Sequence, residues 1–143
     1  MAKLQHIAIA VQDPDEAARF FIDVMEMTIT RASDGPLAQS VFLTDGSIEI
    51  ALIRFKSQDL VGQEFPVGYQ GLHHIGFEVD DLDAAKQRMA ETQFSPRHDI
   101  HAARDALLKA GGGKPNPNLG VEYKYFGPGG ITFDLSQKGW LKK

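Results

Sequence analysis

An internal repeat constrains the fold of this chain more than any other feature of its sequence. A shift of 68 residues lays the segment LQHIAIAVQDPDEA, which starts at Leu4, over the segment LHHIGFEVDDLDAA, which starts at Leu72. The identical pairs are Leu4 and Leu72, His6 and His74, Ile7 and Ile75, Val11 and Val79, Asp13 and Asp81, Asp15 and Asp83, and Ala17 and Ala85. Apolar matches arise easily by chance, whereas a matched histidine and two matched aspartates at one offset do not. The repeat therefore indicates a duplicated unit, the alternative being two unrelated strand-to-helix units that share their capping residues.

Each copy of the repeat predicts a strand followed by a helix. Residues 4–11 alternate between bulky side chains and small or polar ones, which is the period of a half-buried strand. Asp13 then has the position of a helix N-cap, with Pro14 at the first helical position and Glu16 three residues after the cap. The second copy repeats the order of strand, aspartate cap and helix.

Short β-prone segments follow each predicted helix. In the first half they lie at residues 28–32, 40–44 and 47–54. Asp45-Gly46 joins the last two as a hairpin, so the first half is predicted to be β-α-β-β-β. In the second half two closing strands are predicted at 120–126 and 131–136.

These elements predict one domain over residues 1–143, built from two tandem modules. The first module spans 1–56, a linker spans 57–70, and the second module spans 71–138 with an insertion at 92–119. Within the insertion, HAARDALLKA favours a helical turn or two and GGGKPNPNLG favours a loop. The predicted fold class is α+β, in which the two β-α-β-β-β modules form a curved, cup-shaped mixed sheet and the helices cover its outer face.

Composition excludes several kinds of site and partner. The chain has no cysteine, which excludes disulfides, iron–sulfur clusters, thiolate zinc sites and cysteine nucleophiles. Its formal net charge is −4 and no basic stripe is visible, so we expect no nucleic-acid partner. No apolar run approaches the roughly 20 residues of a membrane span, and the first residues do not resemble a secretory signal. We therefore expect a cytoplasmic protein with no membrane contact.

The residues able to bind a metal lie on the faces of the predicted strands that carry small side chains. His6 and His74 share their faces with Ala and Gly, while the bulky residues of the same strands face the helices. Glu49 and Asp134 occupy the corresponding position in the closing strand of each half. A concave sheet face lined by small residues leaves room for a ligand. The sequence therefore predicts that His6, Glu49, His74 and Asp134 converge in the cup.

Two imidazoles and two carboxylates suit one divalent ion, which could be Fe, Ni, Zn, Mn or Co. The carboxylates would neutralise its charge, and four protein ligands on an octahedral ion would leave two positions for water or substrate. This pattern is typical of a catalytic site rather than a structural one. A lone histidine on a strand is more often a hydrogen-bonded packing residue. The equivalence of the four positions in the two copies is what favours a metal site.

The remaining histidines and charged residues have simpler interpretations. His73 is expected on the helix-facing side of its strand as a core residue, and Glu122 is expected to be a solvated strand residue. For His98 and His101, in the insertion, solvated surface is expected, with a lid as the alternative. Four basic residues could recognise an anionic substrate but are expected to be exposed charges, namely Arg31, Arg54, Arg97 and Lys124.

The duplicated module and the segments LQHIAIAV, GLHHIGFEVDDLDAA and ITFDLS resemble the vicinal oxygen chelate superfamily. This group includes glyoxalase I, methylmalonyl-CoA epimerase, extradiol dioxygenases and bleomycin or fosfomycin resistance proteins, and the resemblance covers about residues 4–137. It implies that the metal ligands come from the first and last strands of each half, which are here His6, Glu49, His74 and Asp134. The last ligand of the family is usually Glu in an I-E-L context, whereas this chain has Asp134 in F-D-L.

The resemblance implies that a metal chelates two neighbouring oxygens of a small substrate and stabilises an enediolate or a similar oxyanion. We therefore expect a metal-dependent lyase or isomerase of the glyoxalase type. In it, Glu49 and Asp134 would be the catalytic carboxylates that move a proton next to a carbonyl. The epimerase of the superfamily uses a Glu outside the ligand set, where this chain has Ser40, Val41 and Phe42, so that reaction is disfavoured.

Two alternative functions stay open. One is an extradiol-type ring-cleavage dioxygenase, with Fe(II) held by His6, His74 and Asp134. The other is a non-catalytic protein that binds a small ligand in the same cup, as resistance proteins do. In each case the resemblance implies a small-molecule partner and a homodimer.

Overall fold

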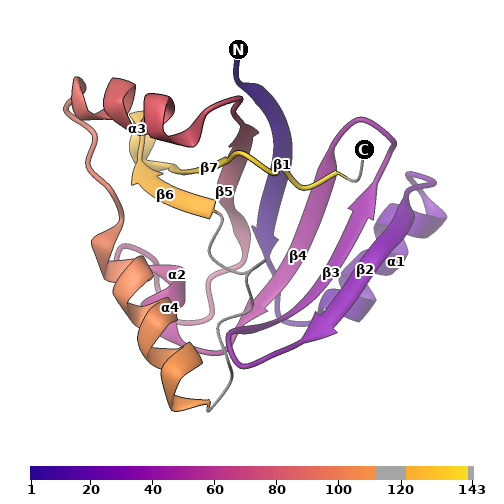
Figure 1. The fold of residues 1–143 in the computed structure, drawn as a ribbon. Coiled ribbons are helices and arrows are strands. Elements are labelled where there is room, and N and C mark those ends of the chain that lie inside the picture. Colours follow the sequence, from indigo (N-terminus) through magenta and orange to yellow (C-terminus); the bar gives the residue numbers. More distant parts are fainter. Residues whose placement is uncertain (112–121, 142–143) are drawn as a thin grey trace.

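The computed structural model describes residues 1–111 and 122–141. Within them seven strands form one mixed sheet in the order β2-β3-β4-β1-β5-β7-β6 (Figure 1). The elements are β1 (Lys3–Ala10), α1 (Pro14–Asp23), β2 (Thr28–Asp34), β3 (Ala38–Thr44), β4 (Glu49–Phe55), α2 (Gln58–Val61), β5 (Gly71–Glu78), α3 (Leu82–Ala90), α4 (His98–Ala110), β6 (Glu122–Phe126), the 3-10 turn η1 (Pro128–Gly130) and β7 (Thr132–Ser136). No helix in these residues is long and apolar enough to cross a membrane.

The two modules meet edge to edge in the middle of the sheet. β1 pairs antiparallel with β5, which places His6 opposite Gly76. β1 also runs parallel to β4, and β5 runs parallel to β7, so each module sets its first strand beside its last. The sheet is curved, and α1 and α3 lie on its outer side (Figure 1). The predicted α+β fold class is confirmed.

The duplicated aspartates begin the first helix of each module, as the sequence predicts. The carboxylate of Asp13 accepts a hydrogen bond from the Glu16 N–H at 3.1 Å, and that of Asp81 accepts one from the Ala84 N–H at 3.0 Å. These bonds satisfy backbone donors that a helix N-terminus otherwise leaves unpaired. Asp45 likewise accepts backbone N–H groups in the β3–β4 hairpin, where the hairpin was expected.

The two faces of the sheet carry different side chains. On the outer face a core under α1 contains Ala18, Met27, Val41, Leu43 and Leu52, and a core under α3 contains Val79, Ala85, Tyr125 and Leu135. On the inner face the buried cluster is smaller and consists of Ala8, Ala51 and Ile53. The larger apolar cores therefore hold the helices, and the inner face carries the smaller cluster.

The second module departs from the predicted β-α-β-β-β order. After α3, Pro96 makes an isolated bridge with Tyr125 in place of a further strand, and the chain then forms α4, which has 13 residues. This helix is longer than the turn or two predicted for the insertion at 92–119. The remainder of that insertion, including most of GGGKPNPNLG, lies outside the described residues. The predicted linker at 57–70 contains α2, whose N-cap is Ser57.

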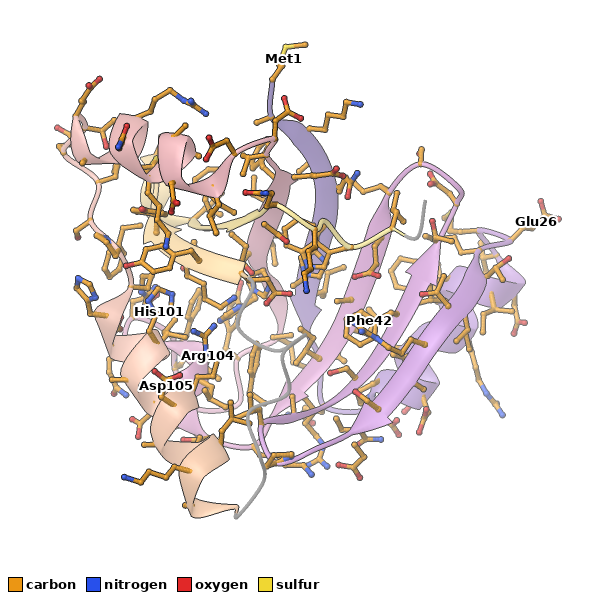
Figure 2. The ribbon with its side chains drawn as sticks, viewed as in Figure 1. Met1, Glu26, Phe42, His101, Arg104 and Asp105 are labelled. Atoms are coloured by element: carbon orange, nitrogen blue, oxygen red, sulfur yellow. The ribbon has the colours of Figure 1, made fainter. Side chains whose placement is uncertain are left out.

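Residues 95–101 protect the free edge of β6. The Nε2 atom of His101 accepts the Lys124 backbone N–H at 3.0 Å. The Arg97 N–H donates to the Lys124 carbonyl at 2.8 Å, and the Phe126 N–H donates to the Ser95 carbonyl at 2.9 Å. Because these backbone groups of β6 are already paired, the edge strand is not free to pair with a strand of another molecule. His101, expected at the surface, is therefore buried on the side of α4 that faces β6 (Figure 2).

We expect His101 to make the stability of the protein depend on pH. Burial, together with the positive charges of Arg104 and Lys124, lowers the pKa of His101 from 6.5 to about 4. Between these values the unfolded chain binds a proton that the folded chain does not, so the free energy of unfolding falls as the pH falls from 6.5 to about 4. Urea denaturation should show a steeper loss in the wild type than in His101→Gln, by at most about 1.4 kcal/mol per pH unit. Equal slopes in the two proteins would contradict this role for His101.

Candidate metal centre

Three of the four predicted ligands come together on the inner face of the sheet. His6 on β1, His74 on β5 and Asp134 on β7 each offer one donor atom, and these atoms lie within 4.8 Å of one another. All three side chains are buried. The strand register explains the convergence, because Gly76 pairs with His6 on one side and with Asp134 on the other. Since Gly76 has no side chain, the groups that flank it approach each other across it.

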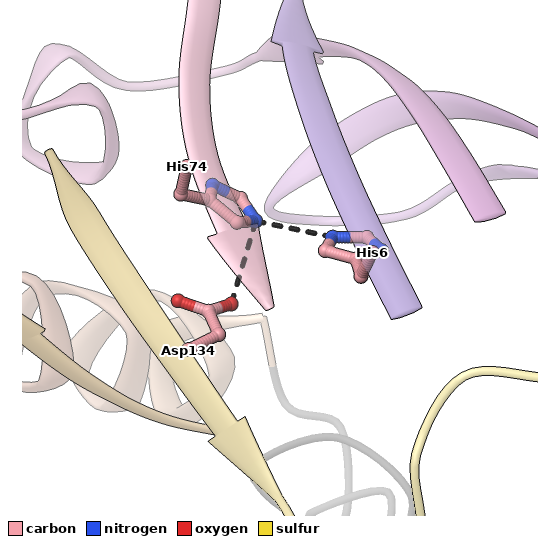
Figure 3. Close-up of side chains that lie close together, drawn as sticks. All are labelled: His6, His74 and Asp134. Atoms are coloured by element: carbon pink, nitrogen blue, oxygen red, sulfur yellow. Dashed lines mark hydrogen bonds and ion pairs between the residues drawn. The ribbon is translucent and has the colours of Figure 1, made fainter. Parts of the chain in front are cut away.

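His74 lies between the other two groups (Figure 3). Its Nε2 atom is 3.2 Å from Nε2 of His6 and 3.4 Å from Oδ2 of Asp134. Glu49, the fourth predicted ligand, is the register partner of His6, and its Oε1 lies 3.0 Å from Nδ1 of that ring. Glu49 therefore contacts the opposite nitrogen of His6 and stands outside the group of three. The two carboxylates lie at the two ends of the imidazole pair.

The contact with Glu49 decides which nitrogen of His6 carries the hydrogen. An ionised carboxylate only accepts hydrogen bonds, so Nδ1 of His6 is the donor. In the neutral ring Nε2 is then a bare acceptor, and this is the atom that faces His74. A carboxylate that orients an imidazole in this way is a frequent support for a metal-binding histidine.

Asp134 is a buried acid beside a buried ammonium group. Its Oδ2 accepts a hydrogen bond from Nζ of Lys124 at 2.6 Å, whereas Oδ1 has no hydrogen-bond partner in the described part of the chain. Burial raises the pKa of Asp134, and the charge of Lys124 opposes that rise. Leaving a buried acceptor unpaired costs about 1–3 kcal/mol. A cation at this place would remove that cost.

The donors present fit a divalent metal ion. They are the bare Nε2 of His6, the imidazole of His74 and the carboxylate of Asp134 with its unpaired oxygen. Nitrogen and oxygen donors of this kind suit Fe, Mn, Co, Ni or Zn. The shorter side chain of Asp134, where the family usually has Glu, still brings Oδ2 to 3.4 Å from the His74 ring.

The chain beyond β7 covers one side of this group. The indole of Trp140 stacks on the imidazole of His6, with ring centroids 4.8 Å apart and planes 11° apart. Its Nε1–H donates to the Glu122 carboxylate at 3.0 Å. A Cβ atom on Gly76 would come within 2.5 Å of this indole, so glycine leaves the space that Trp140 fills. In Figure 1 the segment after β7 accordingly crosses in front of β1.

The predictions for two residues of β6 were wrong. Lys124 was expected to be exposed and Glu122 to be solvated, yet the Lys124 side chain is 11% exposed and both contact the site or its cover. The signal was present in the sequence, because Tyr123 and Tyr125 alternate with them and pack under α3. The alternation that places the four predicted ligands, applied to β6, puts these two charged residues in the cup.

Comparison with protein families decides where the chain belongs. The family model described as the Glyoxalase/Bleomycin resistance protein/Dioxygenase superfamily matches residues 3–135. The chain belongs to this superfamily. The resemblance found in the repeated segments is thereby confirmed for nearly the whole chain.

Two curated relatives of this superfamily member are epimerases. The mitochondrial methylmalonyl-CoA epimerase of Homo sapiens is 32% identical over 91 residues, which cover 59% of this chain and 51% of that protein. The ethylmalonyl-CoA/methylmalonyl-CoA epimerase of Cereibacter sphaeroides is 30% identical over 97 residues, which cover 64% of this chain and 71% of that protein. The match thus spans about half the length of the human enzyme.

These relatives bear on the functional prediction at the level of enzyme class. Epimerases are isomerases, which agrees with the expected lyase or isomerase class. Both relatives are named epimerases and neither is named a glyoxalase, so they support the isomerase class and give no support to the glyoxalase-type reaction. Ser40, Val41 and Phe42 offer no carboxylate, so an epimerase reaction in this chain would need its acid–base groups from other strands.

Solved structures share the fold of this superfamily member. A hypothetical protein from Bacillus halodurans has a TM-score of 0.67 and 21% identity, over 99% of this chain and 98% of that one. A methylmalonyl-CoA epimerase in complex with methylmalonyl-CoA and NH4+ has a TM-score of 0.65 and 19% identity, over 94% and 93%. At these identities the likeness shows the fold alone.

Proposed function

We propose that this protein is a metal-dependent epimerase of 2-substituted malonyl thioesters. The names of the two curated relatives support this substrate class. The observation that carries the proposal is the placement of two carboxylates around one imidazole pair. Glu49 contacts His6 at one end of the pair, and Asp134 contacts His74 at the other.

Two acid–base groups are what inversion of a carbon centre requires. The hydrogen between the thioester carbonyl and the carboxylate leaves from one face of the carbon, and a proton returns to the opposite face. A single base that reaches only one face of the carbon would exchange this hydrogen with solvent but would leave the configuration unchanged. The opposed carboxylates of Glu49 and Asp134 therefore suit an epimerase.

The residues of the site have distinct parts in this reaction. A divalent ion bound by His6, His74 and Asp134 would supply positive charge for the oxyanion that forms when the proton leaves. Oδ1 of Asp134, which lacks a hydrogen-bond partner among the described residues, is the oxygen that accepts the proton. Lys124 holds Oδ2 and so keeps the carboxylate oriented. Glu49, which otherwise accepts from Nδ1 of His6, takes up a proton from solvent and returns it to the other face of the carbon, and Asp134 releases its proton to solvent before the next turnover.

The test follows hydrogen exchange and inversion separately. Protein loaded with Co2+ is incubated in D2O with one epimer of methylmalonyl-CoA, deuterium at the carbon between the carbonyls is measured by mass spectrometry, and inversion is measured by circular dichroism. We expect the wild type to catalyse both and chelator to stop both. Glu49→Gln should keep exchange but lose inversion by roughly 100-fold or more, because general acid–base groups contribute about 10²–10⁴-fold. Replacement of the exposed His98 by alanine is the matched control.

Two results would count against this function. Inversion by Glu49→Gln at the rate of the wild type would remove Glu49 from the reaction. No exchange by the metal-loaded wild type would overturn the epimerase itself, and oxygen uptake with a catechol, or binding without turnover, would then favour the ring-cleaving or the binding alternative. A homodimer remains a prediction that light scattering can check.

A further inference from the structure

His73 and His74 are neighbours in one strand, and yet their ring nitrogens touch. Adjacent side chains of a strand normally point to opposite faces, so alternation predicts His73 on the helix-facing side. The pairing of β1 with β5 instead shifts register, because Ala8 pairs with His74 while Ile9 pairs with Leu72. The residue left over is His73, and such a bulge re-aims its side chain. Its Nδ1 lies 2.7 Å from Nδ1 of His74, so the predicted face was wrong although the residue is buried as expected.

The other nitrogen of His73 is held by α2. Its Nε2 lies 2.6 Å from the carbonyl oxygen of Val61, which only accepts hydrogen bonds, so Nε2 carries a hydrogen. The ring is 3% exposed and packs against Phe55 and Phe65, with centroids 4.6 and 5.4 Å away. Burial of this kind favours the neutral ring, in which Nδ1 is an acceptor. The hydrogen between the two Nδ1 atoms therefore belongs to His74.

We propose that His73 is a positioning residue that keeps Nε2 of His74 free for a cation. It does so through a chain of two hydrogen bonds, from His74 Nδ1–H to His73 and from His73 Nε2–H to Val61. The inference rests on the proposed metal site and adds a residue outside its ligand set. Glu49 does the same for His6, so two bare Nε2 atoms face each other at 3.2 Å. That arrangement is repulsive by itself and becomes favourable with a cation beside it.

Without His73, the imidazoles of His74 and His6 can form a hydrogen bond with each other. Nδ1 of His74 then has no acceptor, its hydrogen is better placed on Nε2, and Nε2–H can donate to the bare Nε2 of His6 over the same 3.2 Å. A metal ion must break this bond and return the hydrogen to Nδ1 before it can bind. Loss of a supporting hydrogen bond typically weakens metal affinity about 10- to 100-fold. We expect that weakening in His73→Phe, which keeps an aromatic ring between Phe55 and Phe65.

The experiment compares four full-length proteins, which are the wild type, His73→Phe, His73→Asn and Phe65→Leu. Asparagine offers an amide oxygen near the position of Nδ1 and can accept from His74, so it should restore most of the affinity. Phe65→Leu disturbs the packing of His73 but leaves the hydrogen-bond chain, and it serves as the packing control. Co2+ affinity is measured by quenching of Trp140, the sole tryptophan, which stacks on His6. The hydrogen on His74 is located in the metal-free proteins by nitrogen-15 NMR of the imidazole.

We expect the Nδ1–H form of His74 in the wild type and in His73→Asn, and the Nε2–H form with weakened Co2+ binding in His73→Phe. Equal Co2+ affinity of His73→Phe and the wild type would overturn the inference, and so would an Nε2–H form in the wild type. A weakening in Phe65→Leu as large as that in His73→Phe would reduce the effect to packing and also overturn it. If the wild type has the Nδ1–H form but binds no Co2+, the hydrogen-bond chain is supported and the proposed metal site fails.

Discussion

Replacing His74 with alanine should remove tight metal binding and, with it, exchange of the substrate hydrogen. The His74 ring lies between His6 and Asp134, at 3.2 and 3.4 Å from their nearest donor atoms, so its loss takes away the central donor of the group. Structural zinc sites with four ligands bind the ion with a free energy of about 10–16 kcal/mol, which is about 3 kcal/mol for each ligand. The loss of one ligand should therefore weaken metal affinity by more than about 100-fold. The measurements are elemental analysis of protein purified without chelator and a Co2+ titration followed by Trp140 fluorescence.

His98→Ala is the control for this substitution, because His98 is an exposed histidine on α4. It should retain the metal content and affinity of the wild type. Circular dichroism of His74→Ala must first show that the sheet is intact. One metal per chain retained by a folded His74→Ala protein would place the binding site elsewhere.

Replacing Arg97 with methionine should lower the free energy of unfolding by about 1.5–3 kcal/mol, because hydrogen bonds to charged groups are lost while Glu64 and Asp99, whose side chains are 38% and 48% exposed, stay solvated. Arg97 is 0% exposed, and all five of its guanidinium N–H groups are paired. Asp99 and Glu64 each accept two of these hydrogen bonds, and Thr132 accepts the fifth at 2.9 Å. The guanidinium also lies 4.1 Å over the ring of Phe126. Loss of this side chain removes the hydrogen bonds that connect the start of α4 to Glu64 in the linker and to Thr132 at the start of β7.

Urea denaturation of the metal-free protein measures this effect at neutral pH. The matched control is Arg54→Met, because Arg54 is exposed and bonds the side chain of Gln39, and a contact of this kind contributes about 1 kcal/mol or less. Arg97→Lys should recover only part of the loss, since an ammonium has three donors in place of five. A loss in Arg97→Met no larger than that in Arg54→Met would contradict the structural role of the buried arginine.

Sequence patterns predicted the positions of the site histidines, the helix caps and one hairpin. The repeat placed His6 and His74 at equivalent points of two strands, and alternation put both on the face of small residues. The same patterns predicted the aspartate caps and the β3–β4 hairpin. Apart from the repeat, each of these signals depends on residues within a few positions of one another. Asp134 could be added to the group because the closing strand of the second half follows the same alternation.

Other features of the site depend on the pairing of strands and on contacts between segments that are distant in the sequence. The bulge at His73 is a property of the pairing of β1 with β5, and alternation along one strand cannot report it. The burial of Arg97 depends on a glutamate 33 residues earlier and a threonine 35 residues later. The same holds for Glu49, which the sequence placed among the ligands and the structure places against Nδ1 of His6.

The sequence by itself determined the duplicated module, the inner and outer faces of the strands, and the gathering of imidazole and carboxylate groups in one cup. It could do so because strand period and helix capping act over a few residues. Only the tertiary structure decided which nitrogen of each imidazole is free. It also decided that Lys124 donates a hydrogen bond to Asp134 and that the indole of Trp140 stacks on His6. Those outcomes follow from contacts between residues far apart in the chain, and such contacts exist only once the strands of the two modules have paired.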